Sequence, residues 1–209
     1  MFYNTTGSNN LAIGWQSLRD NVSGQYNTSV GNNALNGCKS NNNTAIGAFA
    51  GETTSTGYNN VCLGYNAITS SSSASNQVVL GNDSITSLRC AVTTITALSD
   101  KRDKKNIEKL ELGLDFIKDL NPCGWNYDRR DWYPEGKSDG SKMSEERNYG
   151  FIAQELKEVQ DKYGINFGLI MEDNPDKLET SEGRLLPLVI KAIQELASRL
   201  EKLEGENVA

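Results

Sequence analysis

The stretch Ser40-Asn41-Asn42-Asn43-Thr44-Ala45-Ile46-Gly47 decides the fold of the first half of the chain, because its pattern recurs. The recurring frame is Gly-x-x-Asn-x-small-aliphatic-Gly, with Ser40 in place of the first glycine in this copy. The closing glycines are 17, 16, 17 and 17 residues apart, at Gly14, Gly31, Gly47, Gly64 and Gly81. A fixed period of this kind predicts a stack of similar structural units.

Each unit is predicted to hold two short strands, because a second short segment such as Ala34-Leu35 follows the closing glycine. The glycines supply corners with positive φ, and the asparagines hydrogen-bond the turns. One or two aliphatic side chains per unit cannot offset an ordering cost of ~1–2 kcal/mol per residue. Neighbouring units or neighbouring chains must therefore complete the core. A disordered Asn/Ser/Gly-rich linker is the alternative, but it gives no reason for the strict placement of aliphatic residues.

Two positions of the frame differ in size. Small residues suit close approach of backbones, and they stand at Ala12, Ser29, Ala45 and Cys62. The next position can line an axis, and it holds Ile13, Val30, Ile46 and Leu63. These repeats resemble the β-prism shafts of viral fibres and the head repeats of trimeric surface adhesins. The resemblance implies an α+β protein whose N-terminal part is an intertwined trimeric β-prism shaft.

The composition shifts near residue 98, from Gly and Asn to charged residues, so the 209 residues are predicted to form two domains, 1–98 and 99–209. Within the first domain, the serine-rich run 70–76 is predicted to be a loop. The β-branched segment 88–98 is predicted to be a final strand.

Charge and composition exclude several classes of protein. A net charge of −6 argues against a nucleic-acid partner, because phosphate contacts need a basic face. No apolar run approaches the ~20 residues of a membrane helix, and no secretion signal begins the chain. Four scattered cysteines without any histidine argue against a metal site, and we expect no cofactor. All four are predicted to be free thiols, mostly packing residues, in a protein assembled in a reducing compartment.

The second domain shows mainly helical patterns. Residues 106–120 carry apolar side chains at steps of three or four, with Gly113 as a candidate break, and Asn121-Pro122 ends this helix. The insertion 128–147 is assigned no chemistry, and Glu172, Asp173 and Asp176 lack the spacing of a calcium loop. The other predicted elements are strands at 124–127 and 167–171 and a helix from about 151 to 162.

The last predicted helix, 183–204, contains a heptad seam that predicts a coiled coil over 184–204. Its apolar residues follow steps of three and four, at Leu186, Val189, Ile193, Leu196, Leu200 and Leu203. Packing against the core of the domain is the alternative for Leu186–Ile193. Leu200 and Leu203 are expected to meet partner chains. The seam therefore predicts self-association.

Ser99 and Lys104 lie at the junction of the two domains. Serine is a poor nucleophile unless a base takes its proton, and the chain has no histidine, so lysine is the remaining base. A lysine can act in this way only when burial keeps it neutral. Chemistry alone makes this a weak signal, because Ser99 or Asp100 could simply be the N-cap of a helix.

Three sequence blocks raise the odds of self-cleavage. They are Ser99-Asp100-x-Arg102-x-Lys104-x-Asn106-Ile107, Leu114-x-x-Ile117-x-x-Leu120-Asn121-Pro122, and Gly150-Phe151-Ile152-Ala153-Gln154-Glu155. Over about residues 99–204 the chain resembles the endosialidase-type intramolecular chaperone domain. That resemblance implies a self-cleaving dyad of Ser99 and Lys104 that acts on the Leu98–Ser99 bond. It also implies supporting roles for Asp100 and Arg102, which are expected to position the turn.

The resemblance implies a viral tail fibre or spike in which the C-terminal domain trimerises and folds the shaft, then releases itself. We expect assembly in the host cytoplasm, a homotrimer in the virion, and a host-surface receptor as a further partner. The alternative is an uncleaved trimeric adhesin with a permanent helical cap. No other enzymatic activity is predicted.

Overall fold

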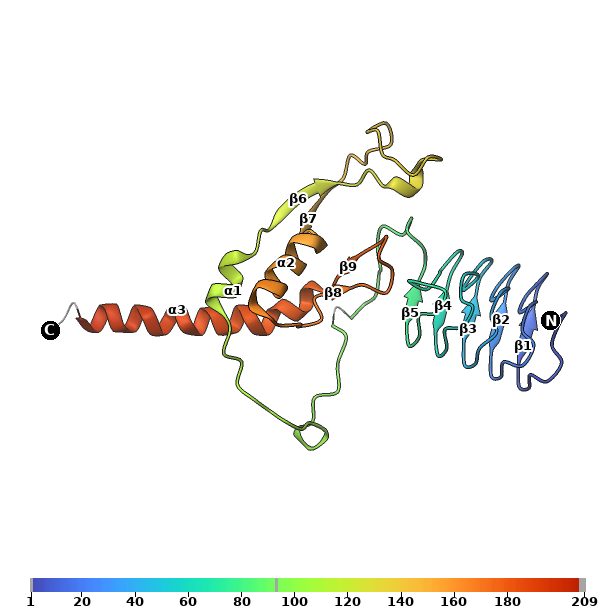
Figure 1. The fold of residues 1–209 in the computed structure, drawn as a ribbon, viewed down its shortest axis with the longest axis horizontal. Helices are drawn as coiled ribbons and strands as arrows, with labels where there is room; N and C mark the ends of the chain where they lie inside the picture. Colours follow the sequence, from blue (N-terminus) through green and yellow to red (C-terminus); the bar gives the residue numbers. More distant parts are fainter. Residues whose placement is uncertain (1, 93, 207–209) are drawn as a thin grey trace. The chain divides into compact units, whose positions relative to one another are not determined.

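Five short strands stack in sequence order at the N-terminal end of the chain (Figure 1). The computed structural model describes residues 2–92 and 94–206. Each strand pairs with the next in parallel and in register, so that Ala12, Ser29, Ala45, Cys62 and Val79 form one row. The strands are β1 (Leu11–Ile13), β2 (Thr28–Val30), β3 (Thr44–Ile46), β4 (Val61–Leu63) and β5 (Val78–Leu80). One chain thus forms a parallel β-solenoid, in which each repeat is one rung.

The prediction of two strands per repeat is wrong. Each rung has one strand, and the second segment forms turns whose apolar side chains enter the core. Leu18 and Leu35 are buried there at left-handed φ values of 49° and 46°. The small residues of the strands are buried as well, and Ser29, Ala45 and Cys62 are each at most 1% exposed. The mixed α+β class is confirmed, whereas an intertwined prism of three chains stays a prediction.

Glycine closes each strand because the rungs approach closely at that point. Gly47 has a φ of +133°, and an added Cβ would lie 2.5 Å from the carbonyl oxygen of Gly64 in the next rung. No side chain fits such a gap, and few would adopt this φ. The regular spacing of the glycines therefore follows from the regular stacking of the rungs.

A ladder of asparagines, buried from Asn27 onward, connects the rungs. Asn10, Asn27, Asn43 and Asn60 each use Oδ1 to accept the backbone N–H of the equivalent residue one rung on, over 2.9 to 3.1 Å. The amide nitrogens of the same side chains donate to backbone carbonyls. Gln77 takes the place of asparagine in the last rung, and its amide bonds Ser70. The asparagines therefore satisfy buried backbone groups between rungs as well as within turns.

Asn43→Ala is expected to destabilise the solenoid by about 2–4 kcal/mol, because it leaves the buried backbone N–H of Asn60 without its acceptor and removes one of the two hydrogen bonds donated by Asn60 Nδ2. Urea denaturation followed by circular dichroism measures this change. The exposed residue Asn32, whose side chain makes no hydrogen bond that the structure records among its described residues, provides the control. Asn32→Ala should change the stability by less than about 0.5 kcal/mol. Equal losses in the two variants would contradict the role of the ladder.

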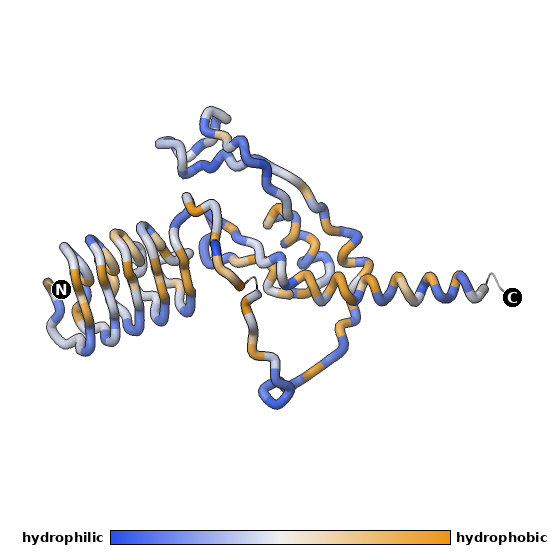
Figure 2. The backbone as a smooth tube through the Cα atoms, turned by 180° about the vertical axis from the view of Figure 1, so that it is seen from behind, coloured by the Kyte–Doolittle hydropathy of each residue, from blue (hydrophilic) through white to orange (hydrophobic). Residues whose placement is uncertain are grey.

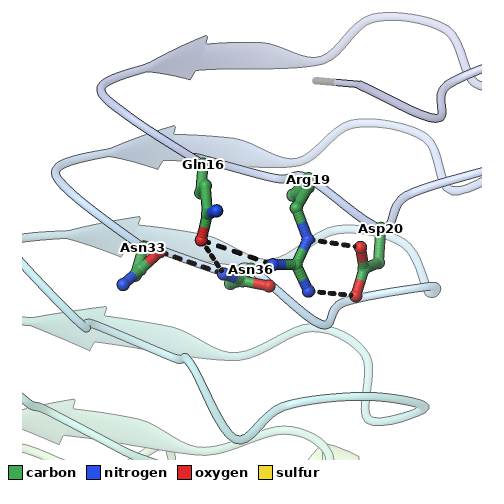
Figure 3. Close-up of polar contacts among 5 residues, drawn as sticks. All are labelled: Gln16, Arg19, Asp20, Asn33 and Asn36. Carbon is green, nitrogen blue, oxygen red and sulfur yellow. Dashed lines mark hydrogen bonds and ion pairs between the residues drawn. The ribbon is translucent and has the colours of Figure 1, made fainter.

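A polar cluster joins the first two rungs on the turn that follows β1 (Figure 3). Arg19 pairs with Asp20 through two hydrogen bonds of 2.7 and 2.9 Å. Gln16 Oε1 accepts from Arg19 and from Asn36 of the second rung. The hydrogen bond from Arg19 lowers the pKa of Asp20, and the same bond raises the pKa of Arg19. The charged side chains of Arg19 and Asp20 thus lie on a turn of the solenoid.

All four cysteines are free thiols, as the sequence predicts. Cys38 and Cys62 are buried in the solenoid core, which confirms their packing role. Cys90 is exposed, so the prediction that the cysteines are mostly packing residues does not extend to it. Burial raises the pKa of the Cys62 thiol to about 11.

Iodoacetamide at pH 8 is expected to modify Cys90 rapidly and to leave Cys62 unmodified in the folded protein. The thiolate is the reactive form, and a pKa near 11 keeps Cys62 protonated as well as inaccessible. Peptide mass spectrometry after timed labelling measures both sites, and labelling in urea should make them equal. Modification of Cys62 at the rate of Cys90 in native buffer would contradict the buried assignment.

The chain folds as two compact units, Met1–Ala97 and Leu98–Ala209. The core of the second unit contains Phe116, Leu156, Leu169, Leu185 and Leu188. Its helices are α1 (Leu114–Asp119), α2 (Ala153–Tyr163) and α3 (Leu186–Glu206), and its strands are β6 (Cys123–Asn126), β7 (Arg147–Gly150), β8 (Ile170–Met171) and β9 (Glu179–Thr180). Short 3-10 helices span Lys101–Asp103, Arg130–Trp132 and Glu182–Leu185. No helix in the described part of the chain could cross a membrane.

Several predicted elements are shorter in the structure. The helix predicted over 106–120 is limited to α1, because Gly113 packs against α3 and an added Cβ would lie 2.8 Å from the backbone nitrogen of Ala192. The strand predicted over 167–171 is limited to β8. No strand forms in the described part of the segment 88–98; Thr93 lies outside the described residues. The predicted strand at 124–127 and the helix near 151–162 correspond to β6 and α2.

Candidate functional site

A tight turn follows Ser99. Asp100 caps the 3-10 helix Lys101–Asp103, because its Oδ1 accepts the backbone N–H of Arg102 over 2.8 Å. The guanidinium of Arg102 also pairs with Asp100 Oδ2 at 2.6 Å, and the hydrogen bonds from Arg102 lower the pKa of Asp100. The backbone N–H of Lys104 then bonds the carbonyl of Lys101. Asp100 and Arg102 therefore hold the turn that brings Lys104 back toward Ser99.

Ser99 and Lys104 are in contact. Lys104 Nζ donates a hydrogen bond of 2.6 Å to Ser99 Oγ. The spacing of five residues is bridged by the 3-10 turn, which is tighter than an α-helical turn. Among the site residues proposed from the sequence, this pair and the Asp100–Arg102 pair are thus brought together in one short segment.

The contact lies in solvent. Ser99 and Lys104 are both exposed, and Leu98 is fully exposed. The exposed pair has the hydrogen bond, but it lacks the buried environment that a lysine base requires. One chain thus provides the short distance between the predicted nucleophile and the predicted base.

Helix α3 carries the predicted seam on its outward side. The six residues of the seam are between 37% and 62% exposed, namely Leu186, Val189, Ile193, Leu196, Leu200 and Leu203. The core of the unit is instead contacted by Leu188 and Ala192, which are at most 4% exposed. Packing of Leu186–Ile193 against the core, the alternative considered from the sequence, therefore does not describe the seam residues.

Glu195 has a role that the sequence did not reveal. Its Oε2 accepts the backbone N–H of Leu114 over 2.8 Å, which satisfies the first turn of α1. Lys191 lies one helical turn away and pairs with the same carboxylate at 3.5 Å. The contact joins residues 81 positions apart, and no local pattern signals it. It fixes α1 against α3, in the unit that also holds the Ser99 turn.

In the described part of the chain, no group of three or more His, Cys, Asp or Glu side chains is placed to hold a metal ion. The polar insertion after β6 is organised around Asp128 instead. This carboxylate accepts hydrogen bonds from the Tyr133 hydroxyl at 2.5 Å and from the Gly140 backbone at 2.8 Å. The insertion is a folded loop held by its own polar contacts.

A known protein family matches part of this chain. The sequence model of the family described as chaperone of endosialidase matches residues 99–165, so the match begins at Ser99 and ends before α3. No curated protein and no solved structure matches the chain. The segment from Ser99 to Ile165 is therefore similar to the family described as chaperone of endosialidase.

Proposed function

We propose that residues 99–209 are an intramolecular chaperone that aligns three copies of the solenoid shaft and then releases itself by cutting the Leu98–Ser99 bond. The observation that carries the proposal is the 2.6 Å hydrogen bond between Lys104 Nζ and Ser99 Oγ. The bond lies at the residue where the family match begins. A chance contact between exposed side chains would have no reason to occur at that position.

The cleavage proceeds through an ester. Neutral Lys104 takes the proton of Ser99 Oγ, and the oxygen attacks the carbonyl carbon of Leu98. The bond from that carbon to the Ser99 nitrogen breaks, and the nitrogen leaves as an amine after it receives the proton from Lys104. Water then hydrolyses the ester, which gives the Leu98 carboxylate and restores the serine hydroxyl. Backbone N–H groups must hold the oxyanion during both steps.

Association of several chains supplies the covered environment that the Ser99–Lys104 pair lacks in one chain. The apolar residues of the exposed seam of α3 alternate in steps of three and four residues, which is the pattern of a coiled coil. When α3 joins copies, a neighbouring chain can cover the exposed Ser99–Lys104 pair and favour the neutral amine. Cleavage is then limited to assembled chains, and a free chain keeps its chaperone.

The order of the domains explains why such a device is useful. Packing of shafts against one another requires non-local contacts, which form slowly and are prone to errors of register. A helix that associates first raises the effective concentration of the shafts and aligns their sequences. We propose that the product is a trimeric fibre of a virion, assembled in the host cytoplasm, with a host-surface receptor as its further partner.

Denaturing electrophoresis with mass spectrometry of the purified full chain tests this proposal. We expect two fragments, residues 1–98 and 99–209, whose new termini are Leu98 and Ser99. The fragments should accumulate only in samples that native mass spectrometry shows to be assembled. One intact band from assembled protein would favour the alternative, an uncleaved adhesin with a permanent helical cap.

A further inference from the structure

The outer side of the solenoid sheet carries larger aliphatic side chains than its inner side. Strand residues alternate between the two sides, so the positions that flank each buried small residue point outward. We call these ten positions the outer sheet face; they are Leu11, Ile13, Thr28, Val30, Thr44, Ile46, Val61, Leu63, Val78 and Leu80. The five of them recorded as exposed large hydrophobics, Leu11, Ile13, Ile46, Val78 and Leu80, are between 46% and 71% exposed. Figure 2 shows the hydrophobic segments of successive rungs stacked along the solenoid.

The chemistry of this face is that of a protein interface. Eight of its ten residues are aliphatic, two are threonines, and none is charged. Exposed aromatic residues lie in the loops at both ends of the strands, at Trp15, Tyr26, Tyr58 and Tyr65. The Arg19–Asp20 pair lies on a turn instead. Contiguous apolar surface bordered by aromatic residues marks contact with another protein.

The repeat identifies the occupant. Each rung offers the same pair of outward positions, and neighbouring rungs are about 4.8 Å apart. A second copy of the solenoid presents apolar pairs at the same pitch, so every rung finds an equivalent rung. We propose that the outer sheet face packs against the outer sheet faces of the other copies of the chain in the assembly, with equal residues at equal height.

This arrangement differs from an intertwined prism. Each strand already pairs with its neighbours in its own chain, so the contact between copies is made by side chains alone. The inference deepens the proposed function, because it names the partner of the shaft, and it rests on that function for the parallel direction of the copies, which alignment of their sequences requires. It does not depend on cleavage.

Homotypic disulfide trapping tests the inference in the full chain. The protein carries Ser99→Ala to keep it intact and Cys90→Ser to remove the exposed thiol. Ile46→Cys is then added, and oxidation is followed by non-reducing electrophoresis. We expect 46–46 cross-links to form about tenfold faster than those of the control Thr53→Cys, an exposed turn position of the same rung, because packing raises the local concentration of the thiols. Two further variants, Leu11→Cys and Leu80→Cys, are made separately and mixed. Their cross-links show whether the copies run parallel or antiparallel.

Parallel packing gives 11–11 and 80–80 cross-links, and antiparallel packing would give 11–80 cross-links and overturn the proposed register. Equal rates for Ile46→Cys and Thr53→Cys, in protein that native mass spectrometry shows to be assembled, would overturn the contact itself. The same result would follow if a different protein occupied the face. Circular dichroism verifies that each variant is folded. Cleavage is scored separately in chains that keep Ser99, so failure of this inference and failure of the proposed function give different results.

Discussion

Ser99→Ala and Lys104→Met are each expected to leave the chain intact and the assembly unchanged. Removal of the nucleophile or the base of a two-residue device stops the reaction at its first step. Loss of a base or nucleophile of this kind lowers a rate by about 10³-fold or more, so that no fragment should appear within days. Electrophoresis and native mass spectrometry follow both properties in the same samples.

Two control variants test whether Lys104 acts as a base or only as a positive charge. Lys104→Arg keeps a positive donor near Ser99 Oγ but cannot become neutral, so we expect it to be as inactive as Lys104→Met. Lys105→Met removes a neighbouring exposed lysine and should cut at the normal rate. Cleavage that persists in Ser99→Ala would end the proposed mechanism.

Asp100 and Arg102 hold the turn through their contacts with each other, and the proposed cleavage assigns them no chemical step. Asp100→Ala or Arg102→Ala should therefore slow the reaction and leave the same two fragments. Loss of every fragment in both variants would assign them a more direct part.

Leu196→Asp combined with Leu200→Asp is expected to dissociate the protein. Two carboxylates in each helix would enter an apolar seam, and the cost of several kcal/mol per buried charge exceeds what a short coiled coil supplies. Sedimentation velocity should show the change from assembly to single chains. Cleavage should fall with it, because the exposed Ser99–Lys104 pair then stays in water.

The matched control places the same charges on another side of α3. Gln194→Asp with Ser198→Asp adds two carboxylates at exposed positions outside the seam. This variant should remain assembled and cut normally. Efficient cleavage by the dissociated Leu196→Asp, Leu200→Asp protein would show that one chain suffices for the reaction.

Local patterns predicted much of this molecule because they repeat or follow a single period. The rungs lie where the closing glycines place them, and the apolar residues predicted to form the seam of α3 are exposed. The Ser99–Lys104 contact was within reach of sequence reasoning, since a tight turn spans five residues. The prediction that failed here concerned a segment whose structure is determined by contacts with residues far away in the sequence. Residues 106–113 have a helical pattern, yet Gly113 is held against α3 and Leu114 is capped by Glu195.

The sequence revealed only part of the role of the asparagines. Their period indicated turns, but the hydrogen bond from one rung to the next depends on the stacking itself. The inward direction of the small residues was also hidden, because a three-residue strand gives no long alternation to read. Once Ser29, Ala45 and Cys62 are placed inside, the aliphatic residues beside them must face outward.

The asparagine ladder also decides how the shaft would respond to a mechanical load. Each ladder side chain contacts only the adjacent rungs, so the cohesion of the solenoid is a sum of nearest-neighbour terms. A pulling force applied along the stack would therefore peel rungs from an end one at a time, and each step would break a similar set of bonds. The predicted force trace is a series of small, nearly equal steps, and rungs that have not yet peeled provide the template on which the others can rewind.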